Sequence, residues 1–140
     1  MTALSDNVID LQRSDGDIVS YLVEGGKKIY KGALVVKNAA GYLEPLTDAV
    51  AKVFAGVADE GADATDLADG AIRCRVHKTG VFPFTKNIPI IDDVADAYLE
   101  GMDDATVGGT GDATNHIKVG APVGLYSTTG LLVRIDGFAI

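Results

Sequence analysis

The loop VGGTGDATNH, residues 107–116, carries the residue types that come closest to a phosphate or calcium site. Glycines can bring backbone amides to a phosphate, but a P-loop ends in Gly-Lys-Ser/Thr. Here Gly111 is followed by Asp112, whose charge repels phosphate. A calcium-binding β-roll repeat begins Gly-Gly-x-Gly-x-Asp and stacks in many copies. This chain has one copy, with Asp112 one position early, so the pattern favours a flexible loop.

The groups that could do acid–base, nucleophilic or metal chemistry are few. His77 and His116 are the only histidines, and they lie too far apart in sequence to form a short metal-ligand spacing. No Gly-x-Ser-x-Gly elbow points to a serine nucleophile. A triad scattered through the fold stays open, because triads are recognised by geometry. The sequence predicts no catalytic centre, no metal and no cofactor.

The acidic residues gather in two stretches, 59–69 and 92–112. The first does not follow the oxygen-ligand spacing of an EF-hand, which leaves a weak cation site as the alternative to a solvated loop. Asp92-Asp93 and Asp103-Asp104 are adjacent pairs, and neighbours on a strand point to opposite faces. Neither pair therefore predicts an acid/base dyad, and we interpret both stretches as solvated loops.

A basic stripe occurs within residues 71–78, where apolar and basic side chains alternate. This alternation predicts a half-buried strand, with Cys74 packed inside as a small hydrophobe. Its other face presents Arg73, Arg75 and His77. The stripe is either an ordinary solvated face or a surface that meets acidic loops of a neighbouring subunit, where arginine is favoured.

The whole chain limits the classes of protein that remain. Its 140 residues suit one domain, and its hydrophobic fraction of 47% is that of a globular protein. A net charge of −8 argues against nucleic-acid binding, which needs clustered Lys and Arg. No apolar run reaches the roughly 20 residues that span a bilayer, and the first residues lack a signal-peptide pattern. We expect a soluble protein that is made in a cytoplasm.

Short strand patterns recur along most of the chain. Residues 34–43 read as a hairpin with a turn at Asn38-Ala-Ala-Gly41, and residues 123–135 repeat the design. Residues 47–58 and 92–101 fit either a short helix or a strand. About eight to ten strands at this spacing predict an all-β fold, a small sandwich or a partly closed barrel. The expected core consists of Leu34, Val36, Val53, Val57, Ile72, Cys74, Val76, Val123, Leu125, Val133 and Ile135.

The first 17 residues lack this pattern. Leu4, Val8, Ile9 and Leu11 stand among polar residues without a periodicity that would bury them on their own domain. We therefore expect residues 1–17 to form a flexible arm that becomes ordered on a neighbour, and residues 18–140 to form a single β-domain. The four apolar residues are candidate interface residues.

Several short glycine-based motifs resemble those of tailed-phage capsid cement proteins, also called head decoration proteins. The resemblance covers about residues 30–137, while the arm and the segment around 87–94 depart from the pattern. The matching motifs are Val53-Phe-Ala-Gly-Val-Ala58, Asp69-Gly70, the run from Ile72 to Gly80-Val-Phe82, Asp96-Ala-Tyr98, Val119-Gly120 and Val133-Arg-Ile135.

The resemblance implies a structural virion protein without catalytic chemistry. It implies that residues 52–58 and 95–101 are strands. It also implies a homotrimer that binds the major capsid protein on the outer surface of the mature shell, with no nucleic acid, membrane or small-molecule substrate as partner. Two alternatives stay open: an adhesion or carbohydrate-binding β-domain of a phage fibre or surface protein, and a small trimeric enzyme with a shared site. Five Tyr and no Trp offer the carbohydrate alternative little stacking surface.

Overall fold

The computed structural model describes residues 17–87 and 98–140, and in these ranges the chain is all-β. This confirms the predicted fold class. No helix occurs among the described residues, so none there is long and apolar enough to cross a membrane. The expected arm lies outside the described ranges. The strands are β1 (Ile18–Leu22), β2 (Lys28–Ile29), β3 (Leu34–Lys37), β4 (Leu43–Pro45), β5 (Val53–Ala58), β6 (Ala62–Asp63), β7 (Arg73–His77), β8 (Val81–Lys86), β9 (Leu99–Gly101), β10 (Thr106–Gly108), β11 (Lys118–Leu125) and β12 (Gly130–Arg134).

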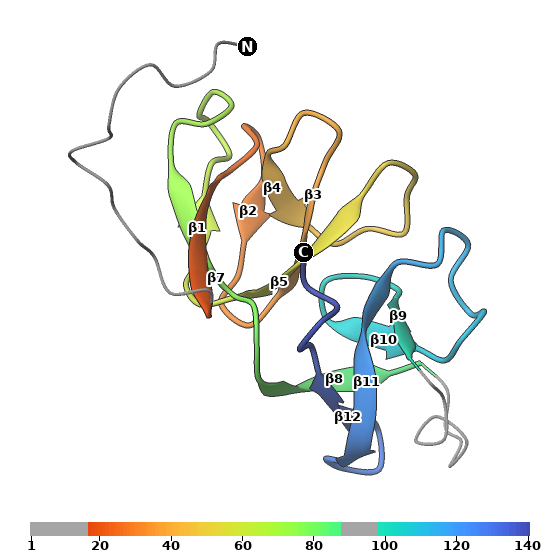
Figure 1. Cartoon of the computed structure of the whole chain (residues 1–140). Coiled ribbons are helices and arrows are strands. Elements are labelled where there is room, and N and C mark those ends of the chain that lie inside the picture. Colours follow the sequence, from red (N-terminus) through yellow and green to blue (C-terminus); the bar gives the residue numbers. More distant parts are fainter. Residues whose placement is uncertain (1–16, 88–97) are drawn as a thin grey trace, which may run out of the picture.

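The first seven strands build a curled sheet with a small ribbon beside it (Figure 1). The sheet has the order β1-β7-β5-β3-β4, with antiparallel neighbours, and β2 pairs with β6 in the ribbon. Just after β1, Val23 forms a parallel bridge to Leu43 of β4. The Glu24 amide also donates to the Leu43 carbonyl at 2.9 Å. The two outer strands therefore approach each other, and the sheet is a partly closed barrel.

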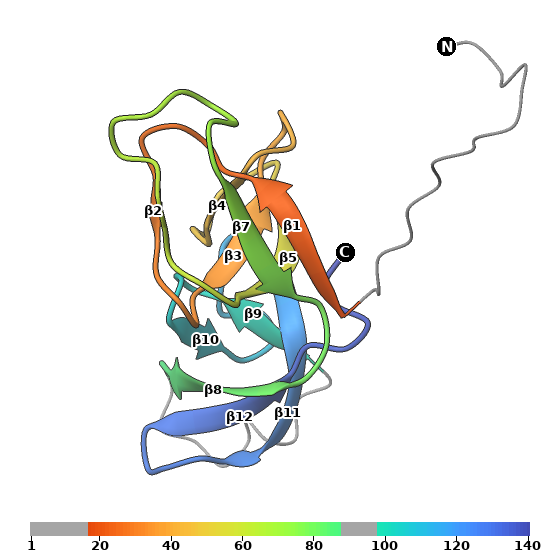
Figure 2. The same ribbon diagram turned by 90° about the vertical axis from the view of Figure 1, so that its left-hand side faces the viewer.

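The last five strands form a closed barrel in the order β10-β8-β12-β11-β9 (Figure 2). Its only parallel pair is β10 with β8, within the described residues. Strand β11 contains an irregularity between Pro122 and Gly124, where its register with β12 shifts. The hairpin expected at residues 123–135 is present, with Tyr126 N donating to Gly130 O at its tip.

Two apolar cores hold these parts together. Strand β3 shows how, because Leu34 and Val36 belong to one core and Val35, between them, belongs to the other. The first core joins the sheet to the interior of the barrel. It contains Leu34 and Val36 from the sheet and Phe84, Leu99 and Val133 from the barrel, with eight other buried residues. The second core fills the curled sheet around Val23, Leu43, Cys74 and Val76. Burying a side chain of this kind contributes about 1.5–3 kcal/mol.

Seven of the eleven expected core residues are buried: Leu34, Val36, Val57, Cys74, Val76, Val133 and Ile135. Ile72 is half-buried against the second core. The prediction was wrong for Val53, Val123 and Leu125, which are 42%, 45% and 54% exposed. Val53 begins β5 beyond the core. In β11 the irregularity breaks the alternation, and β9 pairs only with the first part of the strand, so the second part has one neighbour.

The hairpin turn at residues 38–41 is formed as predicted. Gly41 has a φ of +89°, a conformation that glycine adopts without steric cost. The Asn38 side-chain oxygen accepts from the Ala40 amide at 3.0 Å and from the Tyr42 amide at 3.1 Å. This is the local hydrogen bonding by which asparagine favours turns.

Candidate functional site

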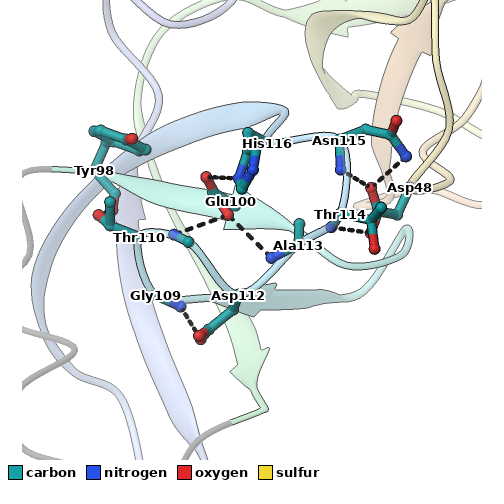
Figure 3. A network of polar contacts seen from close by, with 11 residues as sticks. Asp48, Tyr98, Glu100, Gly109, Thr110, Asp112, Ala113, Thr114, Asn115 and His116 are labelled. Carbon is teal, nitrogen blue, oxygen red and sulfur yellow. Dashed lines mark hydrogen bonds and ion pairs between the residues drawn. The ribbon is translucent and has the colours of Figure 1, made fainter.

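The glycine-rich loop before β11 is held by a network of polar contacts (Figure 3). Glu100 of β9 is fully buried, and its Oε1 accepts from the Gly111 amide at 3.1 Å and the Ala113 amide at 3.0 Å. Its Oε2 lies 2.9 Å from Nδ1 of His116. One buried carboxylate therefore fixes both the loop backbone and the imidazole at its end.

A second carboxylate holds the same loop from the connection between β4 and β5. Asp48 accepts from the backbone amides of Thr114 and Asn115, both at 2.8 Å, and from the Asn115 side chain at 3.0 Å. The Thr114 amide is the main reason why the pKa of Asp48 lies below its ordinary value. Asp112 closes the loop on itself, accepting from the Gly109 amide at 2.7 Å. The sequence predicts a flexible loop, whereas the structure shows one tied to two other segments.

Glu100 orients the imidazole of His116, but no nucleophile contacts the ring among the described residues. His116 has a φ of +53°, which is uncommon for a residue with a side chain, and its side chain is 58% exposed. A carboxylate that orients a histidine is one half of a nucleophile–base arrangement. In the described ranges the ring has no hydrogen bond besides that with Glu100. No three His, Cys, Asp or Glu among those residues gather to hold a metal ion. The geometry supports a structural role for the pair.

The predicted basic stripe lies on one face of β7, but most of it is paired within the chain. Arg75 contacts Glu60 at 3.1 Å and Asp59 at 3.4 Å. His77 Nε2 lies 2.8 Å from the Asp59 carboxylate. Only Arg73 lacks an acidic partner among the described residues, and its guanidinium reaches the Ser20 carbonyl at 3.4 Å. One interpretation of the stripe was that it contacts acidic loops of a neighbouring subunit. For Arg75 and His77, the acidic partners are instead residues 59–60 of the same chain.

Strand β1 lies beside the stripe and adds apolar surface to it. The register places Ile18 opposite His77, Ser20 opposite Arg75, and Leu22 opposite Arg73, so these side chains share a face. Ile18 and Leu22 are 42% and 37% exposed. We call these six residues the β1–β7 face. Strand β1 ends the sheet order, and β7 is the only strand that pairs along its length in the described part of the chain.

The remaining predicted interface residues, Leu4, Val8, Ile9 and Leu11, lie outside the described residues. Their docking on a neighbour stays a prediction. Comparison with known proteins does not choose among the surfaces: no family model, no curated protein and no solved structure matches the chain.

A carboxyl pair that the sequence does not reveal links the segment just after β1 to strand β4. Glu44 of β4 is 4% exposed and contacts Lys52 and, at 3.3 Å, the Asn38 amide group. A hydrogen bond with Glu44 is the main cause that raises the pKa of Glu24. Burial acts to raise the pKa of Glu44, but hydrogen bonds from Glu24, Lys52 and Asn38 outweigh it and lower that pKa. Glu24 therefore keeps its proton to a higher pH than an ordinary glutamate, and Glu44 loses its own at a lower pH.

Glu24→Gln is expected to remove one pH dependence of stability. In the parent, the raised pKa of Glu24 stabilises the fold at low pH, and this contribution is lost as pH rises through that pKa. The lowered pKa of Glu44 acts oppositely, and its contribution is lost as pH falls. A glutamine amide donates to Glu44 at every pH, so the variant should gain about 0.5–1.5 kcal/mol over the parent between pH 5 and pH 7. Urea unfolding at both values measures this gain, and parallel pH profiles of the two proteins would contradict it.

Proposed function

We propose that this chain is a structural protein of a tailed-phage virion, which binds the outer surface of the mature capsid shell and acts as cement between capsomers. The observation that carries the proposal is the β1–β7 face, together with the outer edge of residues 18–22, along which no described strand pairs. All five residues of β1, Ile-Val-Ser-Tyr-Leu, are uncharged. The sequence resemblance described above supports the same class of protein.

An edge strand of this composition needs a partner. Unpaired backbone groups on an uncharged edge form a template for another strand, and monomeric proteins usually block such edges with Lys, Pro or a bulge. β1 contains none of these. A second chain that pairs with β1 would also cover Ile18 and Leu22. This surface suits a protein whose role is to bind other subunits.

The partners in this proposal are the major capsid protein and two further copies of the chain. The net charge of −8 fits an outer position, because the inner wall of a filled shell faces DNA. Contacts that bridge several capsomers stabilise the assembled shell by mass action, since cement binds that state in preference to the separated subunits. No catalytic step is part of this function.

Sedimentation with purified shells tests the proposal directly. We expect the protein to sediment with mature, expanded shells and to remain in the supernatant with immature ones. Leu22→Lys puts a charge on the open edge and should abolish most of the binding, whereas Val50→Lys, at a side chain that is 77% exposed, should not. Equal loss in both variants, or no binding of the parent to either shell, would refute the proposal.

Within this proposal, Arg73 is expected to orient the protein on its partner. Its guanidinium has no carboxylate partner in the described part of the chain, so Arg73→Glu should leave the melting temperature within about 2 °C of the parent. Charges at the rim of an interface mainly change the association rate and its salt dependence. We expect slower shell binding at low salt for Arg73→Glu, measured by light scattering. Lys27→Glu makes the same charge change at another exposed residue and serves as the control.

A further inference from the structure

A groove runs along the junction between the curled sheet and the barrel. Two hollows of about 330 and 340 Å³ meet there and share Gly32 and Ala105 as lining residues. The junction is fixed, because the Leu34 amide donates to the Asp104 carbonyl at 2.9 Å and so joins β3 to the turn before β10. We call this feature the tyrosine groove, since Tyr30 lines one of its hollows and Tyr126 the other.

The two tyrosines give the groove aromatic surface at separate points. Tyr30 and Tyr126 are 61% and 65% exposed, and neither hydroxyl has a hydrogen-bond partner among the described residues. Lys28 lies 5.1 Å from the centre of the Tyr30 ring, so part of that ring is already in contact. Tyr126 packs beside Gly130, which leaves room for the ring. Tyr126 is therefore the main platform, held in place by the β11–β12 hairpin.

Apart from Lys31, which lines the same hollow as Asp104, the polar side chains of the groove are a carboxylate and hydroxyls. Asp104 is half-buried, and the only donor to its carboxylate is its own backbone amide. Burial, followed by the nearby charge of Asp103, raises its pKa. Thr85, Ser127 and Thr129 line the other hollow with hydroxyl groups. A ligand that donates several hydrogen bonds would satisfy Asp104 better than the protein does.

We propose that the tyrosine groove binds a neutral saccharide. The C–H face of a sugar ring packs on the negative face of an aromatic ring, while its hydroxyls donate to carboxylates. A groove with aromatic surface and a few convergent polar groups is the usual form of a small-ligand site. Anionic sugars and nucleotides fit less well than neutral sugars, because Asp104, with the charge of Asp103 nearby, disfavours them although Lys31 lines the same hollow. A proline-rich segment offers few N–H donors, so it would leave the Asp104 carboxylate unsatisfied.

Titrations followed by backbone amide NMR test this proposal. The probes are maltotriose, cellotriose and tri-N-acetylchitotriose as neutral sugars, trigalacturonate as an anionic sugar, and decaproline as a peptide. We expect at least one neutral sugar to shift the amides of Ala105, Ser127 and Thr129, and trigalacturonate and decaproline to leave them unchanged. Absence of shifts with all three neutral sugars, or shifts with decaproline alone, would overturn the proposal.

Variants of the groove separate binding from folding. Tyr126→Ala should weaken the neutral sugar about threefold to tenfold, whereas Tyr126→Phe keeps the ring and should bind as the parent does. Asp104→Asn should weaken the neutral sugar and reduce the discrimination against trigalacturonate. Equal binding by the parent and Tyr126→Ala would contradict the assigned platform. Leu22→Lys lies outside the groove and should bind sugar normally, so failure of sugar binding and failure of shell binding are distinguishable.

Discussion

Gly56→Ala is expected to destabilise the fold more than a Gly→Ala change at any other glycine in residues 17–87 and 98–140. Gly56 lies in β5 with a φ of +140°, which residues with a side chain rarely adopt. A Cβ atom there would collide with the His77 carbonyl oxygen on the neighbouring strand and approach Val76 Cγ1 to 2.7 Å. Both obstacles belong to the pairing of β5 with β7, which ties the β1–β7 face to the rest of the sheet.

The expected loss is about 3 kcal/mol or more, because backbone strain and overpacking each cost about 1–3 kcal/mol. For a domain of this size the melting temperature should fall by about 2–4 °C per kcal/mol. Gly124→Ala is the matched control, since a Cβ there meets no atom within 4 Å and its φ is ordinary. That variant should be neutral or gain up to about 1 kcal/mol. Thermal melts of the two variants check the prediction, and similar melting temperatures would show that β5 can move away from β7.

Glu100→Ala is expected to release the loop of residues 109–116 from the barrel. The substitution removes the acceptor for the Gly111 and Ala113 amides and for the His116 ring. A buried amide left without a partner costs about 1–3 kcal/mol, and Ala113 is only 3% exposed. We expect a total loss of about 2–4 kcal/mol in the free energy of unfolding, together with faster hydrogen exchange at Ala113.

Two further variants serve as controls for Glu100→Ala. Glu100→Gln keeps one oxygen that can accept from the loop amides, so its loss should be smaller than that of Glu100→Ala. Glu60→Ala removes a carboxylate whose ion pair with Arg75 and whose hydrogen bond from the Arg75 amide are both exposed, and it should cost less than about 1 kcal/mol. Denaturant unfolding measures all three. If Glu100→Ala cost no more than Glu60→Ala, the loop would be held by other contacts.

The carboxyl pair, the loop anchors and the groove share one property that hid them from sequence reasoning. Glu24 follows β1 whereas Glu44 lies in β4, Asp48 is far along the chain from Thr114, and Tyr30 is far from Tyr126. From the sequence alone, only acidic residues that are adjacent in the chain could be considered as pairs. A short polar residue near a turn gives no sign of the distant segment that it contacts.

Local sequence patterns are sufficient to predict the class of the fold. Alternation at residues 71–78 placed Cys74 and Val76 inside and Arg73 and Arg75 outside, and the structure confirms all four. Gly41 and Asn38 determined their turn, because its hydrogen bonds are local and need no other segment. These features follow from the period of two along a strand and from backbone sterics, which act over a few residues.

How the strands close and which surfaces stay exposed depend on contacts between segments that are distant in the sequence. The register shift near Pro122 turns Val123 and Leu125 outward, although their alternation is that of a core strand. Asp59 contacts Arg75 and His77 of the basic stripe only because the chain reverses beside β7. Burial and pairing are properties of segments brought together from a distance, and the free energy that selects among such pairings is shared over the whole core.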